Sequence, residues 1–158
     1  MASSEYLLEV RGLKKYFKVG GKLGEKGGVL RAVDDVSFTL KQGETLGVVG
    51  ESGCGKSTLG NTIIRLLEPT GGQVLFEGQD LTRMTKRQLA AVRPDIQMIF
   101  QDPFSSLDPR IRLFDIIAEP LRVHKAARGQ ELTDRVMGLM KVVGLDASYA
   151  SRFPHEFS

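Results

Sequence analysis

Nine consecutive residues have the composition of a loop that binds phosphate groups. They are Gly50, Glu51, Ser52, Gly53, Cys54, Gly55, Lys56, Ser57 and Thr58. The spacing is that of a glycine, four residues, and then Gly-Lys-Ser or Gly-Lys-Thr. Gly53 and Gly55 can take positive φ, so that successive backbone N–H groups point into one concavity. Lys56 adds a full positive charge, and Ser57 offers a hydroxyl to Mg²⁺. The loop therefore predicts a site for a nucleoside triphosphate with its magnesium ion.

Such a loop needs a strand before it and a helix after it. The run Thr45–Val49 is almost entirely apolar and predicts a strand buried on both faces. Leu59–Leu67 has apolar residues at helical spacing, and Pro69 ends it. The N-terminus of that helix would turn free N–H groups and the positive end of its dipole toward bound phosphates. The alternative is a glycine-rich turn with an incidental lysine, which this flanking pattern disfavours.

Apolar periodicity and turn residues predict the remaining elements. Further strands are expected at 7–10, 33–40, 73–76 and 96–100, and helices at 81–92, 113–126 and 131–143. The 33–40 strand, followed by the turn at 41–43, is expected to form an antiparallel hairpin with the 45–49 strand. A glycine- and lysine-rich surface loop is expected at 18–30, and an irregular loop at 101–109.

Composition excludes several classes of protein. The 158 residues give room for one domain, and 41% hydrophobic with 26% charged residues is ordinary for a folded chain. No apolar run approaches the ~20 residues of a membrane helix, and we expect no signal peptide and a cytosolic chain. The single cysteine, Cys54, excludes an intramolecular disulfide. The net charge of +3 comes from scattered groups, so no nucleic-acid partner is expected.

Several motifs in the expected order make the chain resemble the N-terminal part of an ABC-transporter ATPase subunit. It is most similar to the oligopeptide/dipeptide (peptide and nickel) importer subfamily. The motifs are the loop at 50–58, the run IQMIFQDP at 96–103, and the run SSLDPR at 105–110, which indicates the peptide subfamily. The runs at 32–38 and 154–158 also fit.

The fold that the resemblance implies is α/β, namely a P-loop NTPase of the ABC-ATPase type. It would have a RecA-like core with an N-terminal antiparallel β segment and the start of a helical subdomain, and it would be incomplete. Residues 1–112 would form the ATP-binding core with the phosphate-binding loop and the Q-loop. Residues 113–158 would form part of the helical subdomain, and the C-terminal half of the ATPase domain would be absent.

The resemblance also implies a function, with ATP and Mg²⁺ as cofactors: ATP binding and hydrolysis coupled to the import of peptides or related small solutes. Tyr16 corresponds to the aromatic residue that stacks on adenine. The alternative for Tyr16, and for Phe17 beside it, is a place in the core. Gln101 corresponds to the Q-loop glutamine, which faces Mg²⁺ or the water near the γ-phosphate and assists catalysis.

The resemblance implies two kinds of protein partner. Transmembrane permease subunits would contact the Q-loop and the helical subdomain, and a second ATPase subunit, identical or different, would complete a dimer. The chain would then lie peripherally at the cytoplasmic face of the cell (inner) membrane.

Ser158 lies at the approach to the signature motif of the resembling family. The signature glycines, the strand with the Mg²⁺ aspartate and the catalytic glutamate, and the switch histidine would lie beyond it. We therefore expect no catalytic residue within the chain besides the assisting Gln101, and no ATP hydrolysis above background by this chain alone. The absent strand would also leave the 46–49 edge without a partner. His124 and His155 are expected to be surface groups.

Three other functions fit parts of the sequence. An ABC-type ATPase acting on nucleic acid would be favoured by a basic groove or by zinc-ligand cysteines. A soluble P-loop kinase or GTPase does not account for the Gln101-Asp102-Pro103 run or for the antiparallel segment at the start. A nucleotide-binding regulatory fragment without catalysis would also carry the loop.

Overall fold

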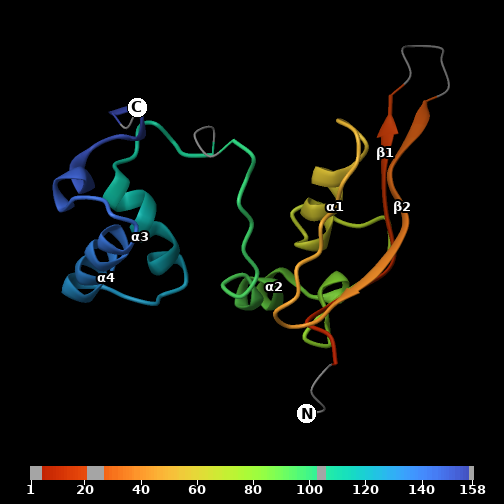
Figure 1. Ribbon diagram of the computed structural model, residues 1–158, viewed down its shortest axis with the longest axis horizontal. Helices are drawn as coiled ribbons and strands as arrows, with labels where there is room; N and C mark the ends of the chain where they lie inside the picture. Colours follow the sequence, from red (N-terminus) through yellow and green to blue (C-terminus); the bar gives the residue numbers. More distant parts are fainter. Residues whose placement is uncertain (1–4, 21–26, 103–105, 157–158) are drawn as a thin grey trace. The chain divides into compact units, whose positions relative to one another are not determined.

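The structure is a computed structural model that describes residues 5–20, 27–102 and 106–156. The chain divides into two compact units, Met1–Gln97 and Met98–Ser158, and each is described by itself (Figure 1). The predicted loops at 18–30 and 101–109 and the run at 154–158 fall partly outside the described residues.

An antiparallel sheet organises the first unit. Its strands are β1 (Leu8–Val19), β2 (Gly28–Leu40), β3 (Gly71–Phe76) and β4 (Gln79–Asp80), in the order β2-β1-β3-β4. Figure 1 shows β1 and β2 side by side as a long ribbon. The partner of β2 is therefore β1, and the predicted hairpin between 33–40 and 45–49 is wrong.

The predicted strand at 7–10 continues to Val19 because Gly12 does not end it. Gly12 takes φ 53°, and the pairing of β1 shifts register on either side of it, between Val10 and Leu13. Such an irregularity bends a strand without ending its ladder. The predicted strand at 73–76 is confirmed as β3.

Two predicted helices of the first unit are shorter than expected. Helix α1 (Lys56–Ile63) ends before Leu67 because Arg65 takes a left-handed φ of 54°. The guanidinium of Arg65 donates to the carbonyl oxygens of Leu81 (2.6 Å) and Met84 (2.7 Å), which holds the chain in this turn. The predicted helix at 81–92 is in fact a 3₁₀ turn, η1 (Leu81–Arg83), followed by α2 (Lys86–Val92). Thr85 starts α2 with a capping box that it shares with Gln88.

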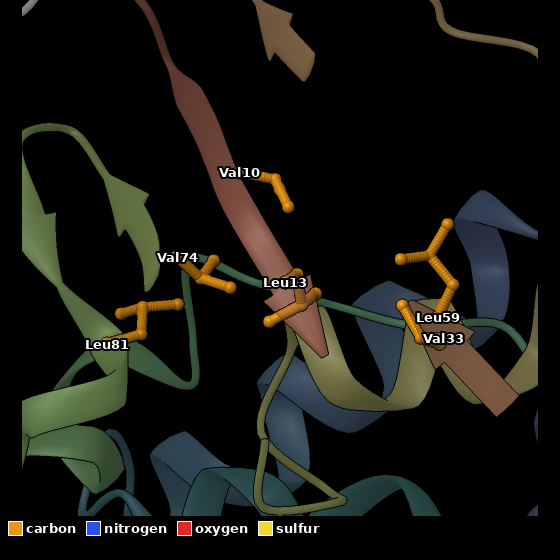
Figure 2. Packing of buried hydrophobic residues seen from close by; sticks show 6 residues of the cluster. All are labelled: Val10, Leu13, Val33, Leu59, Val74 and Leu81. Atoms are coloured by element: carbon orange, nitrogen blue, oxygen red, sulfur yellow. The ribbon is translucent and has the colours of Figure 1, made fainter. Parts of the chain in front are cut away.

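The core of the first unit forms where the sheet meets α1. Its buried residues are Val10, Leu13, Val33, Leu59, Val74 and Leu81. Figure 2 shows Leu13 of β1 in the middle, with Val74 and Leu81 to one side and Val33 and Leu59 to the other. Leu59 is the α1 residue of this cluster, so the core fixes the helix against the β1–β2 hairpin.

Two predicted strands are wrong. The segments at 45–49 and 96–100 have no regular structure, and Val49 and Ile99 are 92% and 94% exposed. A strand persists when a neighbour completes its hydrogen-bond ladder. Among the described residues, no strand pairs with either segment.

Two helices form the second unit. They are α3 (Leu113–Val123) and α4 (Gly129–Val142), followed by the 3₁₀ turns η2 (Ala147–Ser151) and η3 (Pro154–Glu156). Both predicted helices are confirmed, although α3 ends earlier because Lys125 takes φ 55°. Gly144, with φ 75°, follows α4 as the predicted C-terminal cap. The helices enclose a separate buried cluster of Ala118, Ala127, Leu132, Val136 and Met140. Within the described part of the chain, no helix is long and apolar enough to cross a membrane.

Candidate functional site

The loop between residue 49 and α1 has the backbone geometry that its glycines predict. Gly53 and Gly55 take φ of 81° and 104°, both in the left-handed region that L side chains rarely adopt. Gly55 is the residue before α1, which begins at Lys56. The free N–H groups of the first helical turn therefore face the loop, where they can donate to an anion.

The β1–β2 hairpin positions this loop. A Cβ atom at Gly55 would lie 2.2 Å from the carbonyl oxygen of Ala32 in β2, so only a glycine allows this approach. The register between β1 and β2 shifts beside Ala32, between the pairs Lys15–Val33 and Tyr16–Arg31. An irregular point of the hairpin thus lies directly against the loop.

The ammonium group of Lys56 is held inside the loop. It donates to the carbonyl oxygens of Gly50 (2.8 Å) and Glu51 (2.7 Å) and lies 3.6 Å from the Cys54 sulfur. The loop curls tightly enough that a Cβ at Gly50 would lie 2.7 Å from the same sulfur. The loop therefore surrounds a positive charge. Phosphate oxygens could replace the two carbonyl oxygens as acceptors of the hydrogen bonds that Lys56 donates.

A cavity of about 400 Å³ opens between the loop and the hairpin. It is lined by Phe17 of β1, by Leu30, Arg31 and Ala32 of β2, and by Gly53, Cys54, Gly55, Lys56, Ser57 and Thr58. This volume lies within the ordinary range of small-molecule sites. The structure thus brings the later six of the nine predicted loop residues to one cavity, with Ser57 beside Lys56.

Tyr16 and Phe17 have different environments. The Tyr16 hydroxyl donates to the Asp34 carboxylate, and the Arg31 guanidinium lies 5.6 Å from the Tyr16 ring centre. This hydrogen bond raises the pKa of Tyr16 above its usual value and lowers the pKa of Asp34. Phe17, which the sequence did not single out as a binding residue, lines the cavity, and Tyr16 does not. Its pairing with Leu30 across the hairpin depends on the register shift.

Gln101 belongs to the second unit, and its surroundings are described only within that unit. With Phe100, Asp102 and Ser106 it lines a cavity of about 500 Å³. Pro103 of the predicted Q-loop and Ser105 of the next motif lie outside the described residues.

A second cavity of this unit, of about 650 Å³, lies along α3 and was not predicted from the sequence. Its charged lining includes Arg112, Asp115 and Arg122. Arg122 pairs with Asp115 at 2.9 Å, and the Arg112 guanidinium lies 5.9 Å from the Phe153 ring centre. Most of these charges therefore have partners already.

Comparison with solved structures defines the class. The chain matches the dimeric structure of MJ0796, a bacterial ABC transporter cassette, with a TM-score of 0.76 and 28% sequence identity. The match covers 96% of this chain and 63% of that chain. MJ0796 in a post-hydrolysis state bound to ADP and Pi matches equally well. The fold therefore corresponds to part of an ABC ATPase cassette, as the resemblance implied.

The family follows from the sequence. The family described as ABC transporter matches residues 33–158, and the chain belongs to this family. It is 53% identical to the oligopeptide transport ATP-binding protein AppF of Bacillus subtilis, over 99% of this chain and 48% of AppF. It is 49% identical to OppF of the same organism, over 98% of this chain and 50% of OppF.

A third relative, the glutathione import ATP-binding protein GsiA of Escherichia coli K12, is 46% identical over all of this chain and 26% of GsiA. The chain thus spans about half the length of AppF and OppF. These relatives agree with the peptide importer subfamily that the SSLDPR run indicated.

Proposed function

We propose that the loop at 50–58 binds the phosphate groups of ATP. The observation that carries this proposal is the Lys56 ammonium, held by two carbonyl oxygens inside a loop that leads into a helix N-terminus. In the bound state Lys56 would donate to the β- and γ-phosphates, and the backbone N–H groups of 53–58 would donate to the phosphate oxygens. The other loop residues, Gly50, Glu51 and Ser52, complete the turn that holds these groups.

The residues present also fit Mg²⁺. The ion prefers oxygen ligands, keeps several waters, and is bound largely through the phosphates of its nucleotide, so that one or two protein oxygens suffice. Ser57 lines the cavity in the first turn of α1 and would supply one of them. When bound, Mg²⁺ would neutralise phosphate charge. For Gln101 we propose the Q-loop role that the family resemblance implies, with its amide oxygen toward the ion.

For the whole protein we propose ATP hydrolysis coupled to the import of peptides or related small solutes. AppF and OppF are named for oligopeptide transport, and GsiA for glutathione import. Residues 1–112 would act as the ATP-binding core and 113–158 as part of the helical subdomain.

The proposed partners are transmembrane permease subunits, contacted through the Q-loop and the helical subdomain, and a second ATPase subunit. The structure of MJ0796 is described as dimeric, which supports the pairing of two cassettes. The protein would be peripheral, at the cytoplasmic face of the membrane.

Isothermal titration with Mg-ATP tests the binding site. Lys56→Ala should weaken binding about 100-fold or more, since two or three charge-assisted hydrogen bonds to phosphate are lost. Lys141→Ala, in the last turn of α4, removes the same charge from the other unit and should leave the affinity unchanged. Equal affinity of Lys56→Ala and the unmodified chain would refute the site.

A further inference from the structure

Arg93 binds the C-terminal end of α1, the helix that follows the loop at 50–58. Its guanidinium donates to the carbonyl oxygens of Ile64 (2.6 Å) and Arg65 (3.1 Å). Ile64 is the C-cap of α1, and carbonyl groups at a helix C-terminus have no partner within the helix. Arg93 therefore supplies the missing donors and places a positive charge at the negative end of the helix dipole.

A second guanidinium links the same two segments in the opposite direction. Arg65, just after α1, donates to the carbonyl oxygens of Leu81 and Met84, which lie before α2. Arg93 is the C-cap of α2. The Arg65 side chain is only 10% exposed, and Glu68 pairs with it at 2.7 Å. Arg65 and Arg93, here called the arginine clamp, thus fasten the turn after α1 to both ends of α2.

The orientation of α1 depends on such contacts. The helix has eight residues and is about 12 Å long, too short to be stable without packing. Leu59 is its residue in the buried cluster of the unit. Along the axis, Lys56 lies about 4.5 Å before Leu59, and Ile64 about 7.5 Å after it. A tilt of the helix about Leu59 would therefore move both ends, so a contact that holds Ile64 also holds the N-terminus.

The N-terminal end of α1 is restrained less completely. The close approach of Gly55 to the Ala32 carbonyl blocks movement toward β2, but it does not block movement away from β2. The hydrogen bonds of Lys56 go to two carbonyl oxygens of the loop itself, and phosphate oxygens would have to replace these acceptors. The restraint that binding leaves in place is at the other end of the helix.

We propose that Arg93 is a positioning residue for the nucleotide site. It does not line the cavity beside the loop. By holding the C-terminus of α1 against α2, it keeps Lys56 and the N–H groups of the first helical turn directed toward the phosphates. This inference rests on the proposed function, because it requires that phosphates bind at the N-terminus of α1.

The test compares two variants that lose stability for different reasons. Arg93→Met removes the guanidinium and keeps a long side chain, whereas Val74→Ala shortens a buried residue of β3. Both should lower the urea midpoint. Mg-ATP affinity is then measured by titration where each variant is folded. Arg93→Met should weaken it about tenfold, within the roughly 5- to 150-fold range of couplings between separate sites. Val74→Ala should leave it unchanged, although its stability is also lower.

Two further variants separate the hydrogen bonds from the charge. Arg93→Lys keeps the charge but loses the planar pair of donors, so its affinity should fall only about threefold. This variant also carries the comparison with Val74→Ala if Arg93→Met does not fold. Arg87→Met is the matched control, because Arg87 is an exposed residue of α2 and its removal changes the net charge equally. Its affinity for Mg-ATP should not change.

Two results would overturn the inference alone: an unchanged Mg-ATP affinity in Arg93→Met, or an equal loss of affinity in Val74→Ala at the same loss of stability. Failure of the unmodified chain to bind Mg-ATP would overturn the proposed function together with it. Binding that Lys56→Ala weakens and Arg93→Met does not would leave the phosphate site standing and reject the positioning role of Arg93.

Discussion

The loop proposed to bind phosphate has two flanks of similar apolar character, but only one of them is buried and forms a regular element. After the loop, α1 places Leu59 in the core at 9% exposure and buries Thr62 completely. Before the loop, the segment 45–49 is exposed and has no regular structure. The loop is therefore fixed from one side, by α1 and by the contact of Gly55 with Ala32 of β2.

The difference shows what an apolar run needs in order to become an element. The helix α1 makes its own backbone hydrogen bonds, so it needs only a surface on which to bury one face. A strand also needs a neighbour for its N–H and C=O groups. Each of the following predictions tests whether α1 and the β1–β2 hairpin, and not the segment 45–49, hold the geometry of the site.

The largest effect is expected for Gly55→Val. The new side chain would meet the Ala32 carbonyl and would require a β-branched residue at φ 104°. Strain and overpacking together should destabilise the chain by about 3 kcal/mol or more and abolish Mg-ATP binding. Urea unfolding and calorimetric titration measure the two effects.

Gly47→Val, in the segment 45–49 before the loop, is the matched control, because nothing lies within 4 Å of a Cβ at this position. Stability should change by less than about 0.5 kcal/mol. Equal loss of stability in the two glycine variants would show that both flanks hold the loop.

A smaller effect is expected for Leu59→Ala. Truncating a buried leucine leaves a cavity and should lower the free energy of unfolding by about 2–4 kcal/mol. Val48→Ala, on the exposed flank, should cost less than about 0.5 kcal/mol. The urea midpoints of the two variants give the comparison, and a Val48 effect as large as that of Leu59 would contradict it.

The smallest effect concerns the hairpin that supports the loop. Because the hydrogen bond to Asp34 raises the pKa of Tyr16 above 10.0, its stabilisation is present below pH 10 and is lost as pH rises through the raised value. The same bond lowers the pKa of Asp34 below 3.8, so the stabilisation is also lost as pH falls through the lowered value.

Asp34→Asn should therefore return the pKa of Tyr16 toward its ordinary value. An ultraviolet difference titration measures this, with Tyr16→Phe identifying the signal among the three tyrosines. An unchanged pKa for Tyr16 in Asp34→Asn would show that this contact does not form in solution.

Local signals in the sequence were sufficient for much of this architecture. The glycine spacing predicted the positive φ angles at Gly53 and Gly55, and periodicity predicted α3 and α4. The partner of a strand is a non-local property, so the local residue pattern pairs 33–40 with the wrong segment and predicts a strand at 45–49 that does not form.

The same limit applies to the aromatic residues. Which of Tyr16 and Phe17 faces the loop depends on the register shift beside Ala32. No residue pattern in β1 predicts that shift. The sequence shows only that residue 55 is a glycine. The reason for it, the close approach to Ala32, becomes visible only once β2 is known to lie beside the loop.

Hydrogen–deuterium exchange of the loop amides, with and without Mg-ATP, tests the central claim most directly. If the backbone N–H groups of 53–58 donate to phosphate, their exchange should slow on addition of Mg-ATP. AMP, which lacks the β- and γ-phosphates, should protect them far less. Loop amides whose exchange is unchanged by Mg-ATP at saturating concentration would contradict the assignment of this loop as the phosphate-binding site.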